Sequence, residues 1–392
     1  MKNNSYDIHL CTAKDCTGCF SCEGICPVHA ISHAIDKEGF HFPIIDDSIC
    51  IGCRSCEKKC PVLNPVKKNK SSVAYAAWSL SDDVRQKSSS GGIFSEVATY
   101  ILENGGIVVG AELGKDGYVR HTVVREINEL YRLRGSKYVQ SIMTAELYRD
   151  IKDAIKDNKQ ILFSGTPCQA AAVRSVFKNS PLIFTLDIIC HGVPSPKLFN
   201  RVYNEIKDKY KGFESFNFRM LKIWREGFNI DKKTDKGIEN ISLPIEDSYY
   251  LEAFDKGLLS RGCCYSCKYA TMERVGDITV GDFWGIGTTH PFDFDTKKGC
   301  SIVLVNSDNG KQLVNSIKNN LFMEQREAEE TVLSGNEQLQ QPSLKPKGRD
   351  TIYVDFAIKD TKSVIKKYHL IPKKKSFFSR AVGKVLRMIK LR

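Results

Sequence analysis

Apolar residues are spaced in two different ways along the chain, and the change falls near residue 73. Before it, the segments are short and interrupted by proline and cysteine. After it, apolar runs of strand length alternate with stretches of helical period. Residues 93–104 have the pattern of an amphipathic helix that ends at Gly105 and Gly106, and residues 107–113 are predicted as a buried strand. The larger part of the chain is therefore predicted to have an α/β fold.

Strand, loop and helix follow one another twice more. An apolar run at 160–165 leads into a helix at 169–179, and a run at 182–190 leads into a helix at 197–210. In sheets of this kind the loops after the carboxyl ends of strands gather along one edge, where ligand sites form. Cys168 and Cys190 stand at two such ends, so we expect them near a ligand site.

The positive charge of the chain is concentrated in its last residues. The formal net charge is +12, but residues 361–392 hold eleven Lys and Arg and no acid, which leaves the rest at +1. That distribution argues against a nucleic-acid binder. Phe378, Val382, Val385 and Ile389 recur at helical spacing, which predicts a cationic amphipathic tail. We favour contact with an anionic membrane surface; docking on a partner protein and a frayed terminus are the alternatives.

The fifteen cysteines indicate metal binding rather than disulfides. The sequence contains neither the apolar core of a signal peptide nor an apolar run of spanning length, so we expect a cytoplasmic protein, peripheral on the inner membrane face if the tail binds lipid. Thiols are kept reduced in that compartment, and dense cysteine spacing there usually means metal.

Eight cysteines fall twice into the pattern C-x-x-C-x-x-C-x-x-x-C-P, which is typical of two-cluster 4Fe-4S ferredoxins. The cysteine before proline crosses to the other cluster in such proteins. We therefore expect one cluster on Cys16, Cys19, Cys22 and Cys60, and the other on Cys50, Cys53, Cys56 and Cys26. Structural zinc is the alternative, although zinc sites usually show cysteine pairs rather than triplets.

These patterns divide the chain into three parts. An α+β ferredoxin-like domain is expected at 1–70, an α/β domain at 71–360 and the basic tail at 361–392. The first boundary lies in the linker PVLNPVKKNKSS at 61–72, which consists of turn formers and charge.

The remaining cysteines suggest a third set of four thiolates. It comprises Cys168, Cys190 and the C-x-x-C pair of Cys264 and Cys267. From spacing alone the alternatives stay open, because free cysteines are often buried apolar residues and a single pair can bind zinc with other ligands. No role is assigned to the other three, which are Cys11, Cys263 and Cys300.

Five segments, in order, carry a family resemblance: KSSSGGIFSEVATYILE, GSKYVQS, FSGTPCQAAAVR, DIICHGVPSP and CCYSCKYATMERVGDITVGDFWG. Together they resemble the coenzyme F-420 (deazaflavin) hydrogenase/dehydrogenase beta-subunit family over roughly residues 16–287. The resemblance implies an FAD cofactor and a third 4Fe-4S cluster on Cys168, Cys190, Cys264 and Cys267. The FAD contacts that it implies are Ser89, Ser90, Gly91, Gly92, Lys137, Tyr138, Thr166, Pro167 and Gln169.

The FAD contact implied for the glycine-rich loop is physically reasonable, because a helix that begins after SSSGG offers backbone N–H groups to a pyrophosphate. By itself the loop is more typical of a glycine-containing turn before a surface helix. His191 is a candidate for proton transfer and Lys137 for a substrate or phosphate contact. The alternatives are a merely hydrogen-bonded histidine and a solvated lysine.

The expected function is electron transfer between a ferredoxin or other one-electron carrier and a small-molecule substrate, through the clusters and FAD. Deazaflavin-linked metabolism and surface-polysaccharide synthesis are the settings that the resemblance implies. The alternative is an electron-transfer subunit of a larger complex without a substrate of its own.

Overall fold

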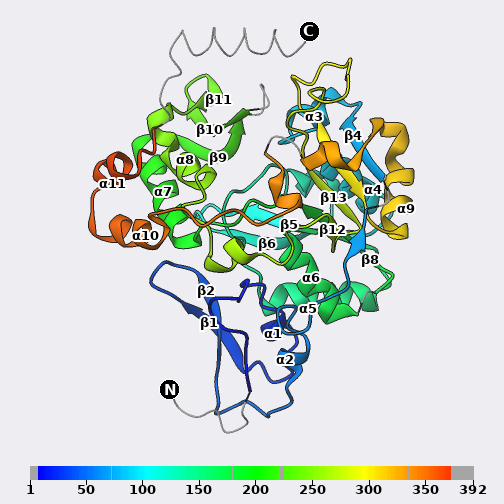
Figure 1. Ribbon diagram of the computed structural model, residues 1–392, viewed down its shortest axis with the longest axis vertical. Helices are drawn as coiled ribbons and strands as arrows, with labels where there is room; N and C mark the ends of the chain where they lie inside the picture. Colours follow the sequence, from blue (N-terminus) through cyan, green and yellow to red (C-terminus); the bar gives the residue numbers. More distant parts are fainter. Residues whose placement is uncertain (1–7, 72, 179, 221–224, 333–334, 372–392) are drawn as a thin grey trace.

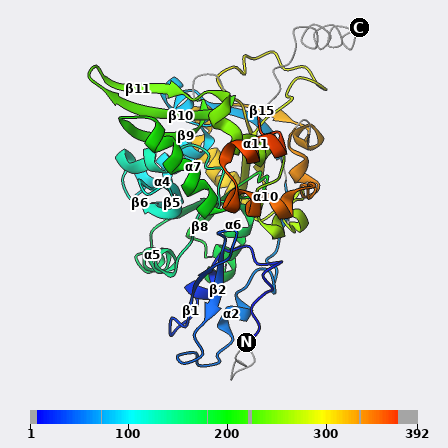
Figure 2. The same cartoon turned by 90° about the vertical axis from the view of Figure 1, so that its left-hand side faces the viewer.

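The computed structural model describes residues 8–71, 73–178, 180–220, 225–332 and 335–371. The N-terminal domain forms one end of the molecule and the large sheet forms the centre (Figure 1). A lobe of a smaller sheet and several helices lies beside the large sheet, and in Figure 2 this lobe faces the viewer. None of the helices in these ranges has the length and apolar character needed to span a bilayer.

The N-terminal domain is built around its cysteines. An antiparallel hairpin, β1 (Ile31–Ile35) and β2 (His41–Ile45), separates two short helices, α1 (Ser21–Gly24) and α2 (Ser55–Lys58). Each helix is preceded by a left-handed residue, so the two cysteine runs adopt the same local backbone. Ile8, Ile31, Cys22 and Cys56 form the small core.

Eight strands form the large sheet, in the order β15-β4-β14-β13-β8-β7-β5-β6. Neighbouring strands β5, β7, β8 and β13 are parallel, and the remaining pairings are antiparallel. The strands are β4 (Val73–Ser79), β5 (Ile107–Leu113), β6 (Val119–Val124), β7 (Ile161–Gly165), β8 (Ile183–Ile188), β13 (Ile278–Asp282), β14 (Ser301–Val305) and β15 (Leu321–Arg326). This sheet and its helices confirm the predicted α/β class, and the predicted strand–loop–helix segments are β7 with α6 and β8 with α7.

Helices cover both faces of the large sheet. On one face, α4 (Ile93–Glu103) and α9 (Asp308–Ile317) pack on Leu162, Phe184 and Val303. On the other, α5 (Ala145–Lys156) and α6 (Pro167–Phe177) pack on Val109, Ile161 and Phe163. The short elements α3 (Asp82–Gln86), β3 (Asn69–Lys70) and β12 (Glu273–Arg274) complete this domain, and β3 pairs with β12.

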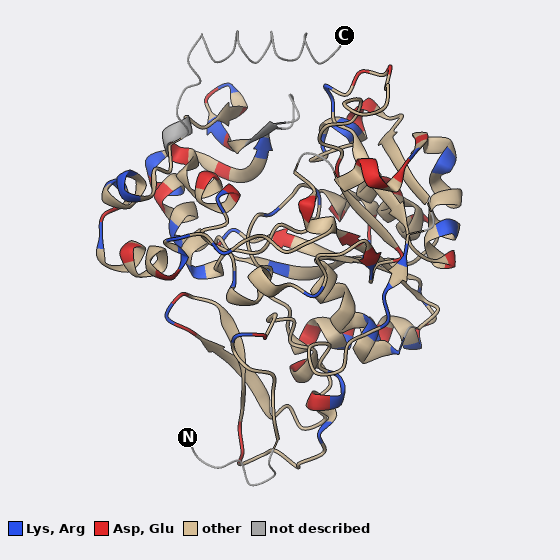
Figure 3. Ribbon diagram, viewed as in Figure 1, with Lys and Arg blue, Asp and Glu red and all other residues tan. Residues whose placement is uncertain are grey.

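The lobe beside the large sheet has its own aromatic core around Phe199, Phe218 and Phe228. It contains strands β9 (Phe213–Met220), β10 (Arg225–Thr234) and β11 (Gly237–Ser242) with helices α7 (Pro196–Lys209), α8 (Tyr249–Asp255), α10 (Arg349–Ile358) and α11 (Thr361–Tyr368). Val364 of α11 lies fully inside this core, so the first residues of the predicted tail belong to the folded lobe. The rest of that tail, from 372, lies outside the described residues. Acidic and basic residues are interspersed over the described elements (Figure 3).

Buried polar contacts attach the N-terminal domain to the rest. The Tyr148 hydroxyl of α5 donates to the Cys19 carbonyl at 2.8 Å, and Arg261 Nε donates to the Cys16 carbonyl at 2.8 Å. Arg349 of α10 forms an ion pair with Glu38 at the tip of the hairpin, at 2.7 Å. Both arginines are almost fully buried, so the first cysteine run and the hairpin have a fixed place relative to the rest of the chain.

Candidate redox site

Cys16, Cys19, Cys22 and Cys60 lie together where the N-terminal domain meets the large sheet; we call them the inner set. Burial raises the pKa of the Cys22 thiol well above its usual value, and the neighbouring Cys19, Cys16 and Cys60 sulfurs add to the effect. Close, buried thiolates are unfavourable without a cationic centre between them, and a cubane of iron supplies one. The structure thus brings Cys60 to the first cysteine run, as the expected crossing requires.

Cys26, Cys50, Cys53 and Cys56 form the outer set. Cys26 and Cys50 pack against the small core, which contains Cys56 of the second run and Cys22 of the first. Cys53 is exposed to solvent, whereas the other three are half-buried or buried. The outer set is therefore the one that solvent reaches.

Four cysteines of the larger domain converge on a small cavity of about 70 Å³, which Cys168, Cys190, Cys264 and Cys267 line; we call them the third set. Cys168 lies in the first turn of α6 after β7, Cys190 follows β8, and the other two lie at the turn 262–267. Burial raises the pKa of Cys190 to about 12, and the adjacent Cys264 sulfur contributes. Among the described residues, no three His, Cys, Asp or Glu side chains could hold a single metal ion.

Three further cysteines were left unassigned by the sequence. Cys11 makes hydrogen bonds with Cys16 and Cys60 of the inner set, and these bonds lower the pKa values of both partners. Cys263 lines the small cavity and makes a hydrogen bond with Cys264. Cys300 is fully buried in an apolar cluster, as a structural cysteine is.

Two tyrosines lie near cysteines of both the inner set and the third set. The charges of Cys19 and Cys168 both raise the pKa of Tyr148, after the larger effect of burial. The same two cysteines act on Tyr269, whose pKa is raised mainly by burial. Cys19 of the inner set and Cys168 of the third set are therefore both close enough to each tyrosine to act on its charge.

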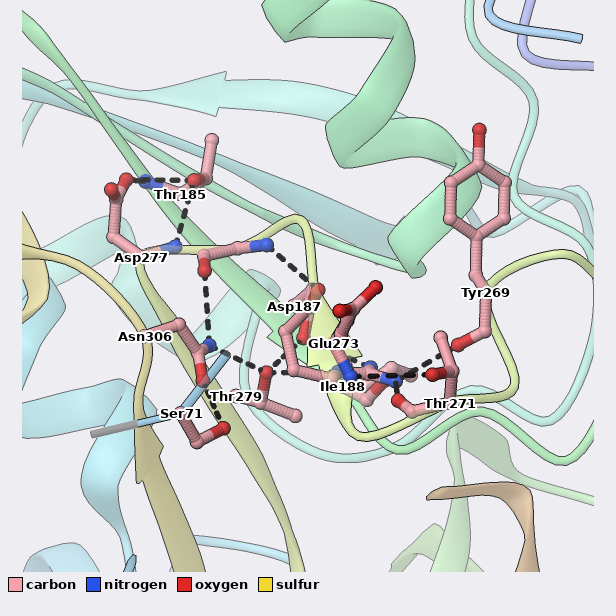
Figure 4. A network of polar contacts seen from close by, with 12 residues as sticks. Ser71, Thr185, Asp187, Ile188, Tyr269, Thr271, Glu273, Asp277, Thr279 and Asn306 are labelled. Atoms are coloured by element: carbon pink, nitrogen blue, oxygen red, sulfur yellow. Dashed lines mark hydrogen bonds and ion pairs between the residues drawn. The ribbon is translucent and has the colours of Figure 1, made fainter. Parts of the chain in front are cut away.

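A buried polar network fixes the loop that carries Cys267. Asp187 of β8 is fully buried and accepts hydrogen bonds from Gly276 N at 2.9 Å and Thr279 Oγ1 at 2.5 Å (Figure 4). Arg274 forms an ion pair with Asp187 at 3.1 Å and donates to the Tyr269 and Ile188 carbonyls at 3.0 and 3.1 Å. The loop after Cys267 is thus tied to the strand that precedes Cys190.

A second, larger cavity of about 1300 Å³ opens along the carboxyl edge of the parallel strands. Its wall includes most of the predicted cofactor contacts: Ser89, Ser90, Gly92, Lys137, Tyr138, Thr166 and Gln169. Cys190 and His191 line this cavity and the small one as well, so the third set borders it directly. Gly91 does not line the large cavity, and Pro167 lines the small one.

The SSSGG loop is shaped by close packing. A Cβ on Gly91 would lie 2.4 Å from the Ala77 carbonyl oxygen, and Gly92 has a left-handed φ of 92° at the N-cap of α4. Ser89 Oγ accepts a hydrogen bond from Ser136 N at 2.7 Å, which joins the loop to the GSKY segment. The N-terminus of α4 therefore faces the cavity with backbone donors and the positive end of its dipole.

Several of the side chains predicted to contact the cofactor already form hydrogen bonds within the protein. Lys137 Nζ donates to the carbonyl oxygens of Leu133 and Arg134 at 3.0 and 2.8 Å, and burial lowers its pKa to about 7. Thr166 and Gln169 form the capping box of α6. Burial also lowers the pKa of His191, so it is neutral at pH 7. Tyr138 accepts a hydrogen bond from Arg219 at 3.0 Å.

Sequence reasoning missed three residues on the wall of the large cavity. His121 Nδ1, Arg134 Nε and Gln338 Oε1 are buried and have no partner among the described residues. Nearly all buried polar atoms in proteins are paired, so unpaired atoms on a cavity wall indicate a ligand. Arg134 directly precedes the GSKY segment, so its place next to a predicted cofactor contact could have been found in the sequence. His121 belongs to no motif of the sequence and could not have been found in that way.

Two family models together match most of the larger domain. Residues 74–148 match the family model for the N-terminal part of the beta subunit of coenzyme F420 hydrogenase/dehydrogenase, and residues 158–331 match the model for its C-terminal part. The chain belongs to this family. Residues 15–64 match a 4Fe-4S dicluster domain, which confirms the predicted two-cluster domain.

One of the solved structures that the chain resembles has limited similarity to it. A chain of the F420-reducing [NiFe] hydrogenase complex from Methanosarcina barkeri, studied with xenon, is 19% identical, and the match covers 66% of this chain and 83% of that chain with a TM-score of 0.42. None of the curated proteins matches. The chain is thus an electron-transfer protein of the beta-subunit type with a 4Fe-4S dicluster domain.

Proposed function

We propose that this protein is an iron–sulfur flavoprotein that passes electrons between a one-electron carrier and an organic substrate. The observation that carries the proposal is the position of the third set. Cys168 lies beside the tyrosines that contact the inner set, and Cys190 lines the large cavity. Electrons that enter at the outer set would then cross the N-terminal domain to the third set and arrive at the cavity.

The donor set of the small cavity fits a third 4Fe-4S cluster. Four half-buried cysteines from three segments surround it, and their mutual repulsion as thiolates calls for a polycationic core. Cys263, beside Cys264, is a fifth thiol in the same wall and takes no part in this assignment.

The large cavity fits a flavin dinucleotide. The N-terminus of α4 and Arg134 would hold its pyrophosphate, and Tyr138 and Thr166 would line its path. When bound, a flavin converts single electrons into a two-electron transfer. A volume of about 1300 Å³ exceeds the ~300–1,000 Å³ of an ordinary ligand pocket, which leaves room for a substrate beside the cofactor. His191, neutral and next to Cys190, is placed to move a proton at its ring nitrogen, whereas Lys137 holds the 133–134 turn.

The test is anaerobic purification with iron, sulfide and flavin analysis. About twelve irons and one flavin per chain are expected from three 4Fe-4S clusters and one dinucleotide. Substitution Cys168→Ser should remove about four irons and leave the two N-terminal clusters, whereas Cys300→Ser, in the apolar core, should leave the iron content unchanged. A flavin-free chain with about eight irons would refute both the third cluster and the flavin.

A second candidate is an electron-transfer subunit without its own substrate, which the beta-subunit description of the family favours. Turnover of a deazaflavin or of a polysaccharide precursor by the isolated chain would exclude it. Turnover only after addition of partner subunits would favour it.

Membrane contact through residues 373–392, which lie outside the described residues, stays a prediction. Removal of this segment should release the protein from anionic liposomes, because each basic residue near the surface contributes on the order of 1 kcal/mol. Binding that is unchanged by the deletion would contradict it.

A further inference from the structure

His121, on β6, lies against the carboxyl end of β7 and lines the large cavity. Its side chain is 6% exposed, and its ring stacks on Phe163 with a centroid distance of 5.2 Å. A Cβ on Gly165 would come within 3.0 Å of His121 Nε2, so the glycine allows the ring to lie against the strand end. The ring is therefore held in one orientation by its surroundings.

One contact fixes the tautomer of this ring. Nε2 lies 3.1 Å from the Ser164 carbonyl oxygen, and because a carbonyl only accepts hydrogen bonds, Nε2 must carry the proton. Burial lowers the pKa of His121 to about 4, so the ring is neutral at pH 7. Nδ1 is then a lone-pair acceptor, and it has no partner among the residues that the structure describes.

The chemistry of the occupant follows from this acceptor. A neutral imidazole nitrogen with a lone pair binds N–H and O–H groups and offers nothing to a phosphate oxygen. The helix N-terminus and Arg134, in contrast, offer only donors. The cavity wall thus has a part that suits an anion and a part that requires a ligand donor, and a flavin dinucleotide carries both kinds of group.

We propose that His121 Nδ1 accepts a hydrogen bond from an N–H or O–H group of the flavin held in the large cavity and so orients it. This inference rests on the proposed function, because it takes the flavin as the ligand. His121 is a positioning residue for the cofactor and not a proton donor.

Two substitutions separate this role from a purely structural one. His121→Gln places an amide nitrogen near Nε2, which preserves the bond to Ser164 and removes the acceptor at Nδ1. His121→Asn places an amide oxygen near Nδ1, which preserves the acceptor and removes the bond to Ser164. Each anaerobically prepared, cluster-containing chain is freed of flavin and titrated with FAD, and flavin fluorescence gives the Kd.

His121→Gln should weaken FAD binding about 5- to 10-fold, and His121→Asn should stay within about twofold of wild type, as the loss of one neutral hydrogen bond predicts. Both variants lose the ring stacked on Phe163. Only His121→Asn also loses the Ser164 bond, so it should lower the melting midpoint of the flavin-free chain further than His121→Gln does. Equal affinity of His121→Gln and wild type would overturn the inference and leave the proposed function intact, and so would weaker binding by His121→Asn than by His121→Gln. If the wild-type chain binds no FAD, the proposed function fails, and the inference with it.

Discussion

Arg274 offers the sharpest test of how the loop of the third set is held. The guanidinium is 2% exposed and forms an ion pair with Asp187, which is fully buried. Substitution Arg274→Met leaves that carboxylate without its cation and the Tyr269 and Ile188 carbonyls without their donor. Removal of one partner from a buried pair typically costs about 3–5 kcal/mol. Because Gly276 N and Thr279 Oγ1 still bond to Asp187, about 3 kcal/mol is expected here.

Anaerobic urea unfolding of the cluster-containing chain measures this cost as a shift of the midpoint at constant slope. The control is Lys87→Met, which removes an ion pair with Asp83 in which both side chains are more than half exposed, and which should change the unfolding free energy by less than about 0.5 kcal/mol. The double variant Asp187→Asn/Arg274→Met, which removes both charges and keeps an acceptor oxygen for Gly276 N, should be more stable than Arg274→Met alone. An unchanged midpoint for Arg274→Met, or a double variant less stable than the single one, would refute the reasoning.

Three further predictions concern the cysteines, the loop and pH. Because Arg274 ties the loop after Cys267 to β8, Arg274→Met should also lose about four irons per chain, measured by iron assay; full iron content would show that the third set does not depend on this loop. Gly91→Ala should displace the SSSGG loop from Ala77 and lower FAD affinity at least about tenfold in a titration, since a Cβ there meets a carbonyl oxygen at 2.4 Å; Gly262→Ala, where nothing lies within 4 Å, is the control. Burial lowers the pKa of His121 from 6.5 to about 4, so between these values the unfolded chain binds a proton that the folded chain does not, and the free energy of unfolding falls as the pH drops. From about pH 7.5 to about pH 5 the wild type should lose about 2 kcal/mol more than His121→Phe in urea unfolding, and parallel pH profiles would contradict the shift.

The parts of the fold that the sequence predicted are those with local patterns. The strands and helices around Cys168 and Cys190 could be predicted because an apolar run and a helical period follow each other without interruption. The two-cluster domain could also be predicted, because the C-x-x-C-x-x-C spacing allows three cysteines to bind one 4Fe-4S cluster.

What could not be predicted depends on contacts between distant segments. β15 lies at the edge of the large sheet and pairs with β4, which is more than 200 residues earlier, so neither its position nor its partner is visible locally. The small sheet of β9, β10 and β11 was missed because its strands carry many charged residues and face solvent on one side. His121 gave no signal because its role depends on how β6 places its ring beside Ser164.

The exposure of Cys53 makes the iron site of the outer set sensitive to oxygen and chelators. This residue is exposed to solvent, whereas the cysteines of the inner set are buried. Dissolved oxygen and iron chelators therefore reach the outermost cubane first, and damage in air begins there and moves inward. A sample that has lost the iron held by Cys53 would keep the iron of the buried inner set.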